Sequence, residues 1–214
     1  MPPAPSSFKA ALQRLLLHPR APAGVALLCA LPGLYLVYGA FTESLGVNPA
    51  ETLIRQSGDL TIRALCYVLL VTPLKDLLRM PAIIRHRRTL GLSVLAYASL
   101  HLLCYAWLDM GLELEDITAD VFKRPFIFVG MAGFVGLIAL GATSFNAAIK
   151  ALGPKRWRRL HQTVYALAGL AVLHFYWMRA GKHRFDDVIF YGAVLALLLL
   201  YRVVKVLRER LSSP

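Results

Sequence analysis

The sequence predicts an all-α integral membrane protein in which six helices form one bundle and both termini are cytoplasmic. Hydrophobic residues make up 57% of its 214 residues and charged residues only 17%, a balance typical of membrane proteins. Six apolar runs each approach the length of about 20 residues that a helix needs to cross a bilayer. Basic residues also alternate between the two sets of connecting segments, as they do in multi-pass proteins.

The six predicted membrane spans follow one another without a candidate domain boundary. They cover residues 23–41, 60–78, 92–108, 126–145, 160–178 and 188–206. A signal peptide is the alternative for the first run, but that run is longer than a typical signal-peptide core, and no small-x-small cleavage site precedes a soluble domain. We therefore expect one transmembrane domain, residues 23–206, between cytoplasmic tails 1–22 and 207–214.

The charge distribution predicts the orientation of the bundle. Seventeen of the 24 Lys and Arg residues lie in the two tails and in the connections after the second and fourth runs. Ten of the 12 acidic residues lie with the other connections. Because cytoplasmic loops collect Lys and Arg, both termini are placed in the cytoplasm. The formal net charge of +12 then reflects the membrane topology, and nothing in its placement indicates a nucleic-acid partner.

The three cysteines give no sign of a metal cluster or a disulfide framework. Cys29, Cys66 and Cys104 all lie within apolar runs, and no two of them form a Cys-x-x-Cys pair. We interpret them as small core residues.

Two histidines are predicted to lie at the same depth in the membrane. His101 lies about 20 Å and His174 about 22 Å along parallel helices from the cytoplasmic side, at 1.5 Å per residue. Ionisable residues within a span are costly and are functional candidates by default. Two imidazoles at one level suit the axial ligands of a heme buried between helices. The alternative is two independent polar residues that are hydrogen-bonded across helices.

A third histidine, His161, begins the fifth run near the cytoplasmic face. It could ligate a second, inner heme, line the start of the helix, or serve a quinone or flavin site. At about 100° per residue, the thirteen positions between His161 and His174 place the two some 140° apart around an ideal helix. One smooth helix face therefore cannot hold both, and the run needs a local bulge or two cofactor-lined faces.

Short motifs spread over almost the whole chain carry a family resemblance. They are Leu45-Gly46-Val47-Asn48-Pro49, Ser57-Gly58-Asp59, Val71-Thr72-Pro73-Leu74, Arg87-Arg88-Thr89-Leu90-Gly91-Leu92, Leu100-His101, Lys123-Arg124-Pro125, Thr143-Ser144, Leu152-Gly153 and Trp157-Arg158-Arg159-Leu160-His161. With histidines in the third and fifth runs, they resemble the ferric reductase-like transmembrane family, which includes the membrane parts of NADPH oxidases. Within that family the chain is most similar to the heme-binding membrane subunits of protein-methionine-sulfoxide reductase systems.

The resemblance implies an electron-transfer subunit in a bacterial inner membrane. Such a subunit passes electrons to a periplasmic molybdenum-cofactor methionine sulfoxide reductase, its partner in a heterodimer, which repairs oxidised proteins. The sulfoxide-reducing site would lie on that partner, so no catalytic residue is expected in this chain. By position, His101 and His174 would be the axial ligands of an outer heme b, and His161 would belong to an inner site.

The sequence departs from the wider family at one position. The oxidases carry two histidines fourteen residues apart in their third span, but Arg87 stands fourteen residues before His101, with His86 one residue away. Arginine stays protonated and is a poor iron ligand. One heme is therefore favoured over two, with Arg87 as the partner of a propionate or of a flavin phosphate.

The electron donor is expected to be a separate molecule. Only eight residues follow Val206, and no Gly-rich dinucleotide fingerprint occurs. Membrane quinol or a cytosolic flavin reductase fits this requirement, and the resemblance adds a bound FMN. Two other functions stay open from the residues: a stand-alone b-type cytochrome or ferric reductase, and a non-redox membrane transporter whose histidines handle protons.

Overall fold

The computed structural model describes residues 7–180 and 185–212, and these residues form nine α-helices and two short helical turns. The predicted tails therefore lie partly outside the described residues. Lys182 and Arg184, two basic residues of the connection after the fifth predicted span, also lie outside them. The elements are α1 (Ser7–Leu17), α2 (Ala21–Phe41), α3 (Pro49–Leu78), the 3₁₀ turn η1 (Pro81–His86), α4 (Arg87–Cys104), the π-helical turn η2 (Tyr105–Asp109), α5 (Leu114–Lys123), α6 (Pro125–Ala142), α7 (Asn146–Gln162), α8 (Val164–Ala180) and α9 (Asp186–Leu211).

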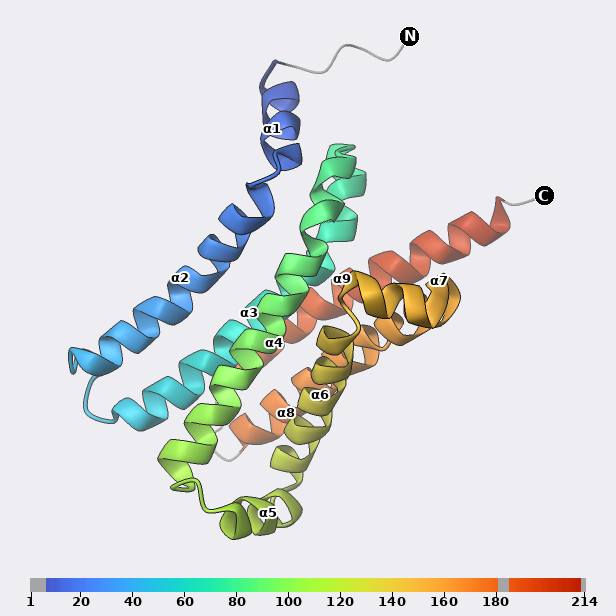
Figure 1. The fold of residues 1–214 in the computed structure, drawn as a ribbon. Helices are drawn as coiled ribbons and strands as arrows, with labels where there is room; N and C mark the ends of the chain where they lie inside the picture. Colours follow the sequence, from blue (N-terminus) through green and yellow to red (C-terminus); the bar gives the residue numbers. More distant parts are fainter. Residues whose placement is uncertain (1–6, 181–184, 213–214) are drawn as a thin grey trace.

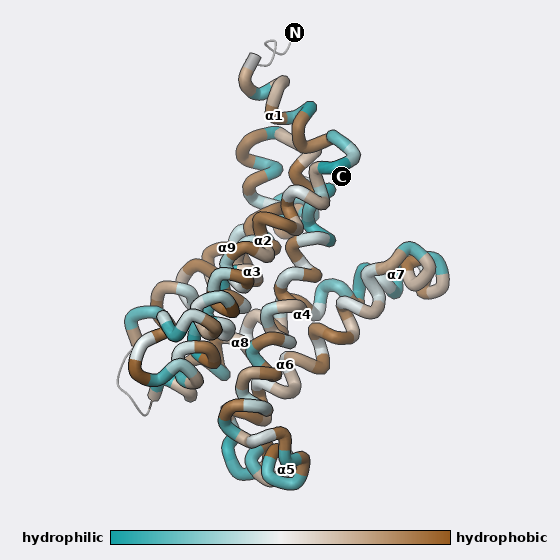
Figure 2. Tube along the Cα trace, turned by 60° about the vertical axis from the view of Figure 1, so that its left-hand side comes forward, coloured by the Kyte–Doolittle hydropathy of each residue, from teal (hydrophilic) through white to brown (hydrophobic). Residues whose placement is uncertain are grey.

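The long helices run along one common direction, and the short ones lie at their ends. α1 and the C-terminal end of α9 lie at one end of the bundle, whereas α5 joins α4 to α6 at the opposite end (Figure 1). Hydrophobic residues dominate the middle of the long helices, and hydrophilic residues gather in the end segments such as α5 (Figure 2). This distribution is that of a multi-pass membrane protein.

Within the described residues, four helical segments are long and apolar enough to cross a bilayer: α2, residues 81–109, α6 and α9. α3 is longer, but Arg63, Lys75 and Asp76 interrupt its apolar part. α8 has only 17 residues, slightly fewer than the roughly 20 that span a bilayer. The count of six spans and the cytoplasmic position of both termini therefore stay predictions.

The structure corrects one sequence expectation and adds a helix that the sequence analysis did not predict. The fifth predicted span, 160–178, is two helices, because α7 ends at Gln162 and α8 begins at Val164, so His161 and His174 lie on different helices. The N-terminal tail also contains α1, which is anchored where Leu16 and Leu17 accept hydrogen bonds from His86 and Arg85. Carbonyls in the last turn of a helix lack intrahelical donors, which is why basic side chains bind there.

The buried core lies where α3, α4, α8 and α9 meet. It includes Leu65 and Leu69 from α3, Val94 from α4, Ala168 from α8 and Leu195 from α9. The outer surface is apolar as well: α2 exposes more than half of Leu27, Leu28 and Leu34. A helix that is apolar on all sides and exposed in the folded chain is stable only against lipid.

A buried arginine compensates for a proline inside α3. Pro73 has no N–H, so the carbonyl of Leu69, four residues earlier, lacks its helical donor. Nη2 of Arg202 on α9 donates to that oxygen at 2.7 Å, and Nη1 donates to the Leu198 carbonyl at 3.2 Å. The guanidinium also lies over the ring of Tyr165 on α8, 5.3 Å from the ring centroid. Arg202 therefore ties three helices together.

We predict that Arg202→Met destabilises the protein by about 1–3 kcal/mol, because it leaves the buried Leu69 carbonyl without a donor. Thermal unfolding of the purified protein in detergent measures the change. Arg208→Met is the matched control, since Arg208 lies on the same helix and is exposed. Equal melting temperatures for the two variants would contradict the role assigned to Arg202.

Candidate functional site

A cavity of about 540 Å³ lies inside the bundle and is lined by residues of α3, α4, α6 and α8. Its walls are mostly apolar and include Leu65, Val94, Phe134 and Leu167. This volume falls within the range of about 300–1,000 Å³ for small-molecule and cofactor sites, which are typically apolar with a few polar groups. His101 and His174 are among the lining residues.

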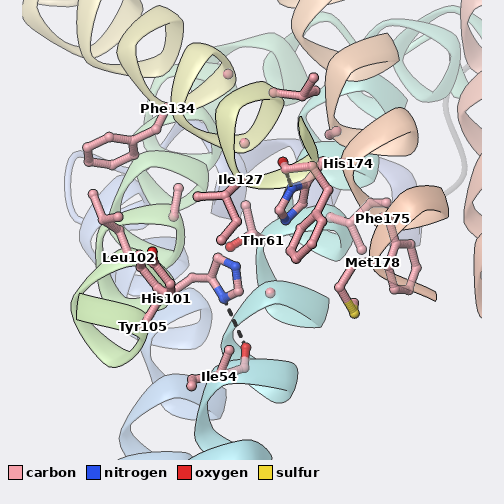
Figure 3. A pocket seen from close by; sticks show the side chains of 18 of the residues that line it. Ile54, Thr61, His101, Leu102, Tyr105, Ile127, Phe134, His174, Phe175 and Met178 are labelled. Carbon is pink, nitrogen blue, oxygen red and sulfur yellow. Dashed lines mark hydrogen bonds between the residues drawn. The ribbon is translucent and has the colours of Figure 1, made fainter. Parts of the chain in front are cut away.

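The two histidines predicted to lie at equal depth meet in this cavity. Their ring centroids are 6.2 Å apart, with an interplanar angle of 78°. His101 enters from α4 and His174 from α8, so the contact joins helices that are distant in the sequence (Figure 3). Both histidines are thus available to one bound group.

The ring of His101 is held by α3. Its Nδ1 lies 2.9 Å from the carbonyl oxygen of Ile54 and 3.3 Å from Oγ of Ser57. A carbonyl oxygen only accepts hydrogen bonds, so Nδ1 carries the proton. In a helix the carbonyl of residue i points toward residue i+4, which here is Gly58. A Cβ at Gly58 would lie 3.1 Å from Cε1 of His101, so the glycine gives the imidazole room to reach this carbonyl.

The ring of His174 is held by α6 in the same manner. Its Nδ1 lies 2.7 Å from the carbonyl oxygen of Phe126, and the residue four positions later is Gly130. A Cβ at Gly130 would lie 2.8 Å from Nδ1 of His174, closer than real Cβ contacts allow. The sequence therefore repeats one device, a helix carbonyl followed four residues later by glycine, at both histidines.

These contacts leave the two Nε2 atoms as the metal-binding atoms. Within residues 7–180 and 185–212, no hydrogen bond to either Nε2 is found. A metal-ligating histidine typically donates its other ring N–H to a carbonyl or carboxylate, as both do here. With metal–nitrogen bonds of about 2 Å, one ion bound by both Nε2 atoms needs ring centroids about 6 Å apart, close to the observed separation. The residues fit a heme with two axial histidines.

In the part of the chain that the structure describes, the charged residues that line the cavity lie toward the α5 end of the bundle. Glu51, Arg55 and Asp59 come from the first turns of α3, Asp109 from η2, and Arg124 directly precedes α6. Arg55 forms an ion pair with Glu51 at 2.5 Å, and Arg124 forms one with Asp120. The cavity is thus polar at one end and apolar along the rest of its wall.

α5 is attached to this polar end through Asp120. The hydroxyl of Tyr105 donates to Oδ2 of Asp120 at 2.7 Å, and Nε of Arg124 donates to Oδ1. Tyr105 lies in the π-helical turn that follows His101, and such turns often occur at functional sites. Burial opposes ionisation of Asp120, but the hydrogen bonds from Arg124 and Tyr105 outweigh it and lower its pKa from the ordinary 3.8.

His161 and Arg87 do not line the cavity. The ring of His161 stacks on Trp157 at 4.2 Å between centroids, and its Nε2 lies 3.1 Å from Oγ1 of Thr143. Arg87, half-buried at the start of α4, lies close enough to His161 to act on it electrostatically. The structure therefore separates these two residues from His101 and His174, and an inner site built on them stays a prediction.

Several residues of the cavity had no assigned role in the sequence. Gly58 and Arg124 occur in motifs that carry the family resemblance, whereas Gly130 and Arg55 occur in none. Gly58 could have been found by depth, because α3 runs antiparallel to α4 and brings residue 58 to the level of His101. No comparable signal identifies Gly130, since glycines are frequent throughout the fourth run.

Comparison with known proteins agrees with this geometry. Residues 57–172 match the model of a family described as ferric reductase-like transmembrane component. The chain is 53% identical to the protein-methionine-sulfoxide reductase heme-binding subunit MsrQ of Polaromonas naphthalenivorans, over 92% of this chain and 90% of that protein. It is 46% identical to MsrQ of Herminiimonas arsenicoxydans over 81% of this chain and 79% of that protein. MsrQ of Caulobacter vibrioides is 41% identical over 84% of each chain.

We predict that Asp120→Asn lowers the melting temperature of the protein near pH 7. The difference in melting temperature between the variant and the wild type should become smaller as the pH falls. A carboxyl whose folded-state pKa is depressed contributes stability above its unfolded pKa and loses it as the pH falls through the folded value. Melting temperatures measured from pH 7 to pH 3 test this, with a drop of about 2–4 °C at pH 7 for a loss of roughly 1 kcal/mol. A difference that does not depend on pH would contradict the ionic role of Asp120.

Proposed function

We propose that this chain, which belongs to the ferric reductase-like transmembrane family and to its MsrQ heme-binding subunits, conducts electrons across the bacterial inner membrane to a methionine sulfoxide reductase. One observation carries the proposal. Two imidazoles face one cavity, and each has its Nδ1 proton committed to a helix carbonyl.

His101 and His174 are the proposed axial ligands of a heme b. A heme held by these two residues would supply one-electron chemistry. The carbonyls of Ile54 and Phe126 fix the tautomer and orientation of the rings and raise the basicity of Nε2. The apolar walls exclude water and hold the site in a low-dielectric environment, which is one of the factors that set a redox potential.

The proposed electron acceptor is a periplasmic molybdenum-cofactor methionine sulfoxide reductase, with which the chain would form a heterodimer. The relatives are named as heme-binding subunits of a protein-methionine-sulfoxide reductase, and that name supports a catalytic partner for this chain. The polar end of the cavity lies at the α5 end of the bundle, opposite the basic segments around η1 and the end of α9. If basic segments face the cytoplasm, that end faces the periplasm.

The proposed donor is the quinone pool or a cytosolic flavin reductase, and it acts at the opposite end. His161 and Arg87 lie there, with Arg202 near enough to Arg87 to interact electrostatically. This concentration of positive charge suits an anionic group, either the phosphate of an FMN or the propionates of a second heme. One heme at His101 and His174 is our primary proposal, and a second at His161 is its extension.

A reduced-minus-oxidised visible spectrum, with heme quantified per polypeptide, tests the proposal. We expect a low-spin b-type spectrum in the detergent-purified protein. His174→Ala should abolish the heme at the His101 and His174 site, whereas His161→Ala should retain at least that heme. Absence of heme from folded wild-type protein made with ample heme supply would reject the redox function and favour a transporter.

A second prediction follows from the glycines that leave room for the imidazoles. Gly130→Ala should lower heme occupancy, because the added Cβ would lie 2.8 Å from Nδ1 of His174 and displace the ring from the Phe126 carbonyl. Gly169→Ala is the matched control, since it lies on an exposed part of α8 with no atom within 4 Å of its added Cβ. Both changes gain helix propensity of up to about 1 kcal/mol, so the comparison isolates the steric effect. Heme content that is equal in the two variants would contradict it.

A further inference from the structure

The proposed heme brings two negative charges into the bundle, and the chain must accommodate them. A heme b carries two propionate carboxylates on one edge of an otherwise apolar macrocycle. An unpaired carboxylate buried in an apolar environment costs several kcal/mol, so such groups are paired or reach water. The residues that line the cavity therefore determine which edge of the macrocycle faces which end of the bundle.

Only one end of the cavity offers positive charge. Among the described lining residues, the only cationic ones are Arg55 and Arg124. The wall farther from α5 is built from apolar side chains, including Leu65, Leu137 and Leu167. A propionate placed against those side chains would lack any partner.

The two arginines stand on different walls from the two histidines. His101 and His174 come from α4 and α8, whereas Arg55 comes from α3 and Arg124 from the start of α6. Both arginines line the cavity toward its α5 end. A group held by both imidazoles would therefore have the two arginines at the same end of the cavity.

Both guanidinium groups retain capacity for a further carboxylate. A guanidinium has five N–H donors. Arg55 contacts Glu51 through Nη2, and Arg124 contacts Asp120 through Nε and Nη2. These contacts hold the arginines at the cavity end without using all their donors, and Arg–carboxylate pairs are among the strongest hydrogen-bonded pairs in proteins.

Three acidic residues, Glu51, Asp59 and Asp109, line the same end of the cavity as the two arginines. Glu51 is the ion-pair partner of Arg55, and the charges nearest to Asp59 include Arg179 and Arg63 as well as Arg55. Arg179 is buried, with 5% of its surface exposed, and also faces Asp187 at 3.7 Å. Asp59 thus has other arginine neighbours, and Arg55 can also interact with a group bound in the cavity.

From the position of the only two arginines among the described cavity-lining residues, we infer that Arg55 and Arg124 bind the heme propionates and orient that edge of the macrocycle toward the α5 end. This inference rests on the proposed heme function and adds to it two binding residues and an orientation. The propionate edge is then the part of the heme nearest the polar surface of the bundle.

The rate of heme release to excess apomyoglobin tests the inference on the full-length heme protein in detergent. We expect Arg55→Gln and Arg124→Gln each to release heme about tenfold faster than the wild type, since each loses a charge-assisted hydrogen bond. Arg63→Gln is the matched control: it lies two turns beyond Arg55 on α3, binds Tyr191 and does not line the cavity. Its release rate should equal that of the wild type.

Reconstitution of the same proteins with heme dimethyl ester, whose propionates are uncharged, distinguishes propionate binding from structural support. The wild type should release the ester about tenfold faster than heme, whereas the Arg55→Gln Arg124→Gln double variant should release both at one rate. If the variants release heme no faster than the wild type, the inference is wrong. It is also wrong if the variants release the ester faster than the wild type does, by the same factor as they release heme. If the wild type binds neither compound, the proposed heme function itself fails.

Discussion

The contact between an imidazole N–H and a helix carbonyl, made twice, is the constraint on which the proposed site depends. Ile54 and Phe126 each offer a second lone pair of a carbonyl that already belongs to a helix, and Gly58 and Gly130 leave the space through which His101 and His174 approach. Because each contact joins two antiparallel helices, α3 with α4 and α6 with α8, the ring positions are fixed by helix packing. The bundle and the site are therefore specified by the same contacts.

Membrane burial explains how the remaining polar groups are arranged. In a bilayer an unsatisfied backbone group costs several kcal/mol, so a proline inside a helix needs a substitute donor for the carbonyl it leaves open. Arg202 fills that role for Pro73 and brings a positive charge close to Tyr165 and Arg87. A single side chain thus repairs the backbone of α3 and shapes the electrostatics of the end at which we propose the donor acts.

The two ends of the bundle differ in chemistry. At one end a polar rim, with Arg55 and Arg124, opens beside the paired imidazoles and under α5. At the other, basic residues and the enclosed ring of His161 form a separate region. α7 bends at Gly153, whose φ is +73°, and His161 lies more than one helical turn before Leu167, the first residue of α8 that lines the cavity.

The sequence by itself determined the helical class, the membrane environment, the family and the pairing of His101 with His174, because hydropathy and helical rise are properties of each segment alone. It also indicated that His161 and His174 could not share one smooth helix, since the angle between them depends only on residue spacing. Only the tertiary structure decided that the fifth run breaks into two helices and that Gly58, Gly130, Arg55 and Arg124 surround the cavity. Those relations join residues on different helices, and packing between helices sets them, which no pattern within a single segment records.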